Sequence, residues 1–316
     1  MTDGQVALGP GAEFDTVRAM LARWGAHAPG VGDDAALLDV PAGQRLVVST
    51  DTSVENVHFK RQWLSPEEIA YRAAAAALSD LAAMGATPLG MVIAITLTEQ
   101  WRAQIAQLAD GFAMASREIG CPIIGGDLTA GSELSIGVTV LGSVKDALTR
   151  SGARAGDSLW VTGRLGGTLL ALRALESGAD AAPAHRTRFA HPVPRIREAQ
   201  WLAAHGATAA IDCSDGVAAD ASHLAAASSA RIILELDELP LVEGATMQDA
   251  AQSGEEYELI VTAPGTLDRA AFEREFGIPI TAIGRVEAAA THAQGLETHT
   301  RGQRVPFPRG HRHFSG

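Results

Sequence analysis

The predicted fold rests on one stretch of the sequence, Ala209-Ala210-Ile211-Asp212-Cys213-Ser214-Asp215-Gly216-Val217. Its apolar start is typical of a short buried strand, and the alanine-rich residues 217–229 that follow predict a helix. The turn between them carries two aspartates, a serine and a glycine. A strand, an acidic turn and a helix in this order indicate an α/β layer with carboxylates at a strand end.

Four further short runs pair aspartate with glycine, serine or threonine, and several of them follow an apolar, strand-like run: Gly32-Asp33-Asp34, Ser49-Thr50-Asp51, Ser79-Asp80 and Gly125-Gly126-Asp127. Carboxylate and hydroxyl oxygens are hard donors, suited to Mg²⁺ that bridges to phosphates. The only lysines are Lys60 and Lys145, and no Gly-x-x-x-x-Gly-Lys-Ser/Thr loop is present. The pattern therefore predicts magnesium-dependent phosphoryl transfer and excludes a P-loop kinase.

Each of these features also has an ordinary structural interpretation. Asp and Ser before a helix are usually N-caps, so any single run favours capping, and only the five runs together favour ligands. His58 by itself is typical of a surface or packed histidine, and Arg150 of a charge in a linker. We expect Cys213 to face inward at its strand end, without a nucleophilic role.

Composition limits the classes of protein to consider. The 316 residues allow two domains, and 47% hydrophobic with 20% charged residues is typical of a globular protein. A net charge of -12 argues against nucleic-acid and anionic-membrane partners. No run approaches the roughly 18 apolar residues of a membrane span, and residues 1–10 do not resemble a targeting segment. With Cys121 and Cys213 expected as buried free thiols, we expect a cytoplasmic protein.

Helical and extended patterns alternate along the chain, which predicts an α/β (α+β) fold. In the first half we expect helices over 13–24, 65–84 and 99–120 and strands over 45–49, 91–97, 123–124 and 134–141. In the second half we expect strands over 159–162, 209–211, 232–236, 258–261 and 282–286, with helices between them. A polar stretch over 145–157 indicates a domain boundary, and residues 183–194 are expected to form a solvated connector.

Seven motifs in order carry a resemblance over nearly the whole chain: Gly32-Asp33-Asp34-Ala35-Ala36-Leu37, Ser49-Thr50-Asp51 with His58-Phe59, Leu78-Ser79-Asp80-Leu81, Gly125-Gly126-Asp127, Thr149-Arg150-Ser151-Gly152, Asp212 with Ser214-Asp215-Gly216, and Glu255 with Tyr257-Glu258-Leu259. The sequence resembles the thiamine-monophosphate kinase family of the aminoimidazole-ribonucleotide-synthetase-like superfamily. The resemblance implies transfer of the ATP γ-phosphoryl group onto thiamine monophosphate, giving thiamine diphosphate and ADP. It also implies a homodimer.

The resemblance also assigns the domains. Residues 1–147 would form an N-terminal domain, a mixed sheet with helices, that binds ATP and Mg²⁺ and dimerises through its sheet. Residues 148–316 would form a C-terminal α/β domain that completes the active site.

The family's site residues are carried over position by position. The implied Mg²⁺ ligands are Asp34, Ser49, Thr50, Asp51, Asp80, Asp127, Asp212 and Asp215. The implied ATP contacts are Gly126, Asp127, Arg150 and Ser214, and the implied substrate contacts are His58 and Glu255. The family's aromatic residue over the thiamine falls on Pro308, with Phe307 beside it, so both are candidates for that position.

No general base is expected. The second pKa of the acceptor phosphate is about 6, so its attacking oxygen is already largely anionic at neutral pH. Repulsion between this anion and the triphosphate calls for several magnesium ions, and an in-line transfer without a phosphoenzyme follows.

The sequence departs from the family pattern at four positions. Ser253 and Glu256 stand where Gly and Asp are usual, Leu128 stands where Thr is usual, and Pro308 stands where an aromatic residue is often found. Two rival interpretations stay open. One is a superfamily relative with other ATP chemistry, such as aminoimidazole ribonucleotide synthetase. The other is a non-catalytic nucleotide- or metal-binding partner protein, which a nucleotide-turnover assay would distinguish from an enzyme.

Overall fold

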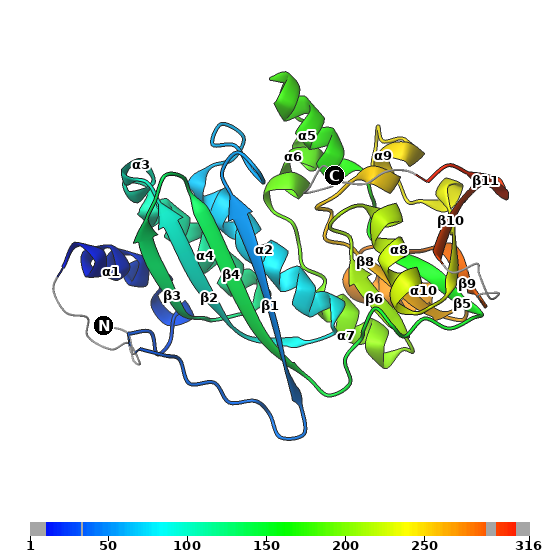
Figure 1. The fold of residues 1–316 in the computed structure, drawn as a ribbon, viewed down its shortest axis with the longest axis horizontal. Coiled ribbons are helices and arrows are strands. Elements are labelled where there is room, and N and C mark those ends of the chain that lie inside the picture. Colours follow the sequence, from blue (N-terminus) through cyan, green and yellow to red (C-terminus); the bar gives the residue numbers. More distant parts are fainter. Residues whose placement is uncertain (1–10, 33, 289–294, 308–316) are drawn as a thin grey trace. The chain divides into compact units, whose positions relative to one another are not determined.

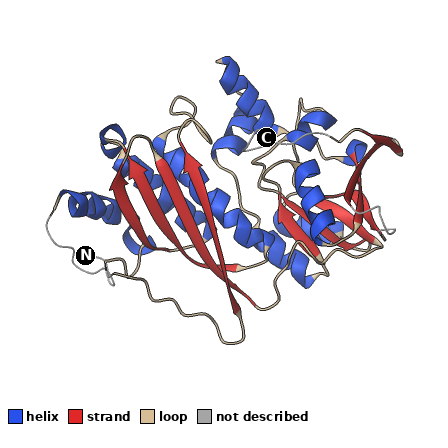
Figure 2. Cartoon of the chain, in the orientation of Figure 1, coloured by secondary structure: helices blue, strands red, loops and turns tan. Residues whose placement is uncertain are grey.

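The computed structural model describes residues 11–32, 34–288 and 295–307, and the chain divides into two compact units (Figure 1). Unit 1 comprises Met1–Leu81 and Ala86–Lys145, and unit 2 comprises Ala82–Gly85 and Asp146–Gly316. Each unit has its own sheet with helices packed on it (Figure 2). The predicted two-domain α/β class is confirmed. No helix in the described ranges is both long and apolar enough to cross a membrane.

Unit 1 is built on a four-stranded sheet in the order β1-β4-β2-β3. The β1/β4 and β4/β2 pairs are antiparallel, whereas β2 and β3 are parallel. Along the chain the elements are α1 (Ala12–Trp24), η1 (Gly25–His27), β1 (Arg45–Val54), α2 (Pro66–Ala83), β2 (Thr87–Leu97), α3 (Glu99–Arg102), α4 (Ile105–Ile119), β3 (Ile123–Ala130) and β4 (Ser135–Val144).

Helices α2 and α4 lie against one face of this sheet (Figure 1). Alternate residues of β2, from Met91 to Leu97, are buried on that face. The predicted start of α2 is confirmed, because the amide of Glu68 donates to Ser65 Oγ and the amide of Ser65 donates to a Glu68 carboxylate oxygen. The two helices pack so closely that a Cβ at Gly111 would lie 2.1 Å from the Glu67 carbonyl oxygen.

All four strands of unit 1 are longer than predicted, and in β1 and β3 the added residues include predicted site residues. β1 continues to Val54 because its ladder with β4 runs from Arg45 without a break. β3 continues to Ala130 because its parallel ladder with β2 resumes at Gly125 after a register shift. Asp51 and Asp127 therefore lie within strands, and the expectation that they follow strand ends is wrong. The helix predicted over 99–120 is also divided, into α3 and α4.

Unit 2 contains a seven-stranded sheet in the order β11-β10-β7-β9-β5-β8-β6. Its elements are β5 (Asp157–Thr162), α5 (Gly167–Ser177), α6 (Pro183–Ala190), α7 (Ile196–Ala204), β6 (Ala209–Asp212), α8 (Val217–Ala227), β7 (Arg231–Glu235), η2 (Leu236–Glu238), α9 (Met247–Gln252), β8 (Leu259–Pro264), α10 (Arg269–Phe276), β9 (Ile280–Glu287), β10 (Gly295–Thr300) and β11 (Gln303–Val305). Only β7 and β10 pair in parallel among these neighbouring described strands.

The core of unit 2 forms where α8 packs on the sheet. Apolar side chains of β5, β6 and α8, among them Val161, Ile211 and Leu224, belong to one buried cluster. Cys213 is part of this cluster, and both Cys121 and Cys213 are buried free thiols, as predicted. Burial raises the pKa of the Cys121 thiol to about 12 and that of Cys213 well above its usual value. Neither thiol is therefore prepared to act as a nucleophile.

Candidate active site

Ser49, Asp51 and Asp80 are associated with the helix-covered face of the sheet in unit 1. Ser49 Oγ donates a hydrogen bond of 2.5 Å to Asp80 Oδ2, which joins β1 to the C-terminal part of α2. Ser49 and Asp51 pair with the buried residues Val140 and Val138 of β4. Directly paired residues point to the same face, so both side chains face the helices.

Thr50 points to the opposite face from its two neighbours. Its Oγ1 lies 3.1 Å from Thr139 Oγ1 on β4. The alternation of a strand thus separates a predicted ligand, Thr50, from Ser49 and Asp51.

Gly126 and Asp127 lie on the opposite edge of the same sheet. β1 and β3 are the two edge strands, separated by three inter-strand steps of about 4.8 Å, or roughly 14 Å in all. Asp127 pairs with Ala94, an exposed residue between buried isoleucines, so it points to the face that α2 and α4 do not cover. A Cβ at Gly126 would lie 2.2 Å from the Ile93 carbonyl oxygen, which gives this glycine a packing role. A single copy of unit 1 does not bring Asp51 and Asp127 together.

Asp34 is exposed and belongs to an irregular segment that precedes β1. It lies outside the strands that carry Ser49, Asp51 and Asp127.

His58 is held in a turn directly after β1. Its Nδ1 accepts a hydrogen bond of 3.1 Å from the amide of Val54, whose carbonyl in turn accepts from the amide of His58. Because Nδ1 is an acceptor, the neutral ring carries its proton on Nε2. The turn is anchored through Glu55 Oε2, which accepts from Trp101 Nε1 at 2.8 Å and from the amide of Leu134 at 3.3 Å. His58 is thus oriented as an Nε2–H donor.

In unit 2, the acidic turn after β6 is organised by a carboxylate that sequence reasoning missed. Asp220 Oδ2 accepts hydrogen bonds from the amides of Ser214, Asp215 and Gly216, at 3.1, 3.1 and 3.0 Å. The sequence indicates Asp220 only as an acidic residue in the first turn of the helix that becomes α8. Burial, together with the charges of Asp212 and Asp215, raises the pKa of Asp220 well above its usual range.

The segment Ser253–Glu258 pairs with this acidic turn through backbone hydrogen bonds. The amide of Glu255 donates to the Ser214 carbonyl at 2.7 Å, and the amide of Tyr257 donates to the Cys213 carbonyl at 2.9 Å. A Cβ at Gly254 would lie only 2.7 Å from the Ser214 carbonyl oxygen, so this close approach requires glycine. The fold therefore brings Glu255 beside Ser214 and Asp215 in the acidic turn, whereas Asp212 pairs with Leu259 at the start of β8.

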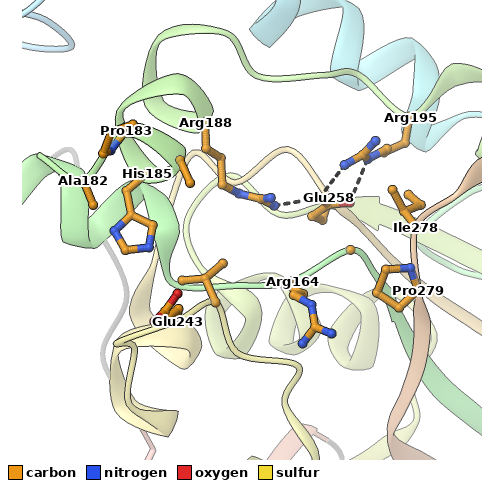
Figure 3. Close-up of a pocket in the computed structure, with 13 residues that line it drawn as sticks. Arg164, Ala182, Pro183, His185, Arg188, Arg195, Glu243, Glu258, Ile278 and Pro279 are labelled. Carbon is orange, nitrogen blue, oxygen red and sulfur yellow. Dashed lines mark hydrogen bonds and ion pairs between the residues drawn. The ribbon is translucent and has the colours of Figure 1, made fainter.

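Two buried glutamates of this segment, Glu256 and Glu258, pair with Arg188 of the predicted connector and with Arg195 just after it; Figure 3 shows the pairs that Glu258 forms. Glu258 accepts from Arg188 Nη2 at 2.6 Å and from Arg195 Nη2 at 2.7 Å, and Glu256 accepts from Arg188 Nε. Burial would raise the pKa of Glu258, but the charges of Arg195 and Arg188 outweigh it and lower the pKa from 4.5 to about 2. The expectation of a solvated connector is wrong, because α6 occupies part of it and its Arg188 pairs with two buried carboxylates.

These arginines line a cavity of about 660 Å³ within unit 2 (Figure 3). Its lining includes three arginines, two glutamates and one histidine: Arg164, Arg188, Arg195, Glu243, Glu258 and His185.

The remaining predicted residues lie apart from the acidic turn or outside the described residues. Arg150 has an exposed side chain, and its carbonyl accepts from Ser228 Oγ at 2.8 Å beyond the end of α8. Phe307 is 43% exposed, next to β11, and Pro308 lies outside the described residues. Within the described ranges, no three His, Cys, Asp or Glu side chains converge as a metal-binding group.

Ser253 and Glu256, two residues that differ from the family pattern, are in contact with each other. Ser253 Oγ donates to Glu256 Oε1 at 2.5 Å, and both side chains are buried. The two unusual residues thus form one hydrogen-bonded pair rather than two separate changes.

Comparison with known proteins agrees with this two-unit architecture. Residues 32–144 match the family model of the AIR synthase related protein, N-terminal domain, and residues 154–294 match that of the C-terminal domain. The chain is 36% identical to the thiamine-monophosphate kinase of Salmonella typhimurium over 304 residues, which cover 90% of this chain and 92% of the relative.

Solved structures also show similarity to thiamine-monophosphate kinases over most of the chain. The crystal structure of thiamine-monophosphate kinase from Stenotrophomonas maltophilia is 34% identical and has a TM-score of 0.81, covering 93% of this chain and 98% of its own. A structure described as AaThiL complexed with AMPPCP and TMP is 28% identical with a TM-score of 0.74, covering 96% and 97%. The sequence motifs, the two units and these relatives together establish that the chain is a kinase and belongs to the thiamine-monophosphate kinase family.

Proposed function

We propose that this protein transfers the γ-phosphoryl group of ATP to thiamine monophosphate, giving thiamine diphosphate and ADP. The observation that carries the proposal is the backbone pairing that joins the segment containing Glu255 to the acidic turn at Ser214. The residue proposed to bind the substrate and the residues proposed to bind phosphate thus belong to adjoining segments of unit 2. The names of the relatives and the AMPPCP and TMP in the AaThiL complex support the same substrates.

The candidate ligands fit magnesium better than a softer metal. Ser49, Asp51, Asp80, Asp212 and Asp215 offer only carboxylate and hydroxyl oxygens, whereas the thiol of Cys213 is buried in the core. Thr50, Asp34 and Asp127, all in unit 1, complete the proposed set of oxygen donors. When bound, several magnesium ions would neutralise and align the phosphates of both substrates for direct in-line transfer.

The side chains of the protein bind and orient the substrates in this proposal. His58, as an Nε2–H donor, would hydrogen-bond the acceptor phosphate and orient its attacking oxygen. Glu255 would face the cationic thiazolium, and Phe307 or Pro308 would form a wall for its ring. Gly126, Asp127, Arg150 and Ser214 would contact ATP. No side chain needs to remove a proton, because the acceptor oxygen is already largely anionic.

We also propose that the protein is a cytoplasmic homodimer that pairs through the sheet of unit 1. Leu46 and Val48, on the β1 face opposite Ser49, are 48% and 55% exposed, and the described helices of unit 1 lie on the other face. Apolar strands need cover on both faces, which a second copy would supply. Light scattering should give a dimer mass without ligand. A monomer mass at micromolar concentration would contradict this proposal.

A steady-state assay tests the proposed reaction directly. Purified protein with ATP and Mg²⁺ should form thiamine diphosphate from thiamine monophosphate, with far lower turnover of thiamine, other phosphomonoesters and aminoimidazole precursors. Preference for an aminoimidazole precursor would favour a superfamily relative with other ATP chemistry. Absence of any nucleotide turnover would favour a non-catalytic binding protein.

A further inference from the structure

We propose that Arg188 is a positioning residue for the reaction proposed above, acting through the carboxylate of Glu256 to hold Glu255 against the acidic turn. Arg188 itself lies in the wall of the cavity and not in the backbone pairing between the two segments (Figure 3). Its effect on the substrate is therefore indirect. The inference rests on the proposed function, because it takes Glu255 to contact the substrate.

Glu256 is the buried anchor of the segment. Its Oε1 accepts from the amides of Gly166 and Thr168, at 2.8 and 3.1 Å, and from Ser253 Oγ. These amides belong to the first turn of α5, whose N-cap residue, Gly166, has no side chain to satisfy them. Oε2 of the same carboxylate accepts from Arg188 Nε. A tertiary contact thus caps the helix and fixes the position of Glu256.

The two residues beside Glu256 need such an anchor. Glu255 and Tyr257 have φ angles of 56° and 51°, in the left-handed region that residues with a Cβ rarely adopt. The segment keeps this conformation only because neighbouring groups hold it. Arg188 binds the carboxylates on both sides of Tyr257, since its Nε donates to Glu256 and its Nη2 donates to Glu258.

The charges around Arg188 favour positioning over ligand binding. Arg188 and Arg195 face Glu256 and Glu258, and Arg195 also pairs with Glu198 at 3.5 Å, so three carboxylates surround two arginines. The guanidinium of Arg188 is therefore committed to buried carboxylates and is not left to attract an anion into the cavity. Loss of Arg188 would leave Glu256 held through Oε1 and would remove the bond to Oε2, which weakens the support of Glu255 against Ser214.

Steady-state kinetics of Arg188→Met, Arg188→Lys and Arg164→Met test this inference. Arg164 lines the same cavity and is exposed, with its Nη1 donating to the Leu241 carbonyl at 3.3 Å, so it is the matched control for charge loss. We expect Arg188→Met to raise the KM for thiamine monophosphate roughly tenfold with a much smaller change in the KM for ATP. Arg188→Lys should recover part of this loss, and Arg164→Met should behave as wild type.

A double-variant cycle with Glu255→Gln separates positioning from general stability. If Arg188 acts through Glu255, the double variant should have the same KM for thiamine monophosphate as Glu255→Gln alone. Additive effects, an unchanged KM in Arg188→Met, or an equal effect of Arg164→Met would overturn the inference. If Arg188→Met does not fold, Ser253→Ala, which loosens Glu256 without changing a charge, should give the same KM shift and the same non-additivity. Absence of thiamine-monophosphate turnover by the wild type would instead refute the proposed function.

Discussion

Replacement of Glu258 by glutamine tests the charge network that supports the active-site segment. Glu258 is fully buried and accepts four hydrogen bonds, from Arg188 Nη2, from Arg195 Nη2 and Nε, and from Thr162 Oγ1, at 2.6 to 2.8 Å. Glutamine keeps the shape of the side chain but removes its charge. It also replaces one acceptor oxygen with an NH₂ group that would face guanidinium donors.

The structure sets the expected size of the effect. The pKa of Glu258 is lowered from 4.5 to about 2, which corresponds to roughly 3 kcal/mol of preference for the charged form. Two buried arginines would also lose their partner, and breaking a buried ion pair costs about 3–5 kcal/mol. We therefore expect Glu258→Gln to lower the free energy of unfolding by about 3–5 kcal/mol at pH 7, or roughly 10 °C in melting temperature.

The pH dependence has a definite sign. A carboxyl with a depressed folded-state pKa stabilises the fold above its unfolded pKa, and this contribution is lost as the pH falls through the folded value. The stability difference between wild type and Glu258→Gln should thus be complete above pH 4.5 and shrink toward pH 2.

Differential scanning calorimetry measures this difference and resolves the two units if they unfold separately. Glu275→Gln is the matched control, because Glu275 is 53% exposed and pairs with Arg197 at 3.4 Å on the surface. Its effect should stay below about 1 kcal/mol. A difference for Glu258→Gln below about 1 kcal/mol at pH 7, or one that does not shrink in acid, would refute the reasoning.

Three further predictions concern the proposed chemistry. Each of three variants removes one proposed anionic Mg²⁺ ligand: Asp51→Asn, Asp80→Asn and Asp127→Asn. Each should lower kcat at least on the order of 100-fold while the circular dichroism spectrum stays unchanged. Near-normal turnover at saturating Mg²⁺ in all three variants would contradict the metal assignment. Phe307→Ala should raise the KM for thiamine monophosphate more than it lowers kcat, because ring stacking is equal in ground and transition states; an unchanged KM would exclude Phe307. Ser253→Gly and Glu256→Asp should each raise the KM for thiamine monophosphate. Because the two residues share a hydrogen bond, the effect of the double variant should be smaller than the sum of the two single effects. Strictly additive effects would contradict this coupling.

Features encoded by near neighbours in the chain were predictable from the sequence. The start of α2 follows from Ser65, Pro66 and Glu68, whose interactions span only three residues. The burial of Cys121 and Cys213 follows from their apolar surroundings. The strand, acidic turn and helix around Asp212 formed as expected, because burial and turn chemistry act there over a few residues.

Strand lengths and the grouping of side chains depended on pairing that the local sequence does not contain. Asp51 and Asp127 have similar sequence surroundings, yet the order β1-β4-β2-β3 places them on opposite edges of the sheet. β3 extends beyond its apolar residues because β2 supplies hydrogen-bond partners as far as Ala130. No local pattern specifies which strands become neighbours.

The sequence by itself determined the chemistry of this protein: the order of its Asp-containing motifs, their oxygen donors and hence its family. Only the tertiary structure decided how the candidate site is supported. Arg188 was predicted to be a solvated charge of the connector, but the fold places it against Glu256 and Glu258, more than 60 residues away, with Arg195 beside it on Glu258. The left-handed backbone at Glu255 likewise persists only because such distant partners hold it. The physical reason is that a buried charge or a strained residue is stable only beside its partner, and chain folding alone brings these partners together.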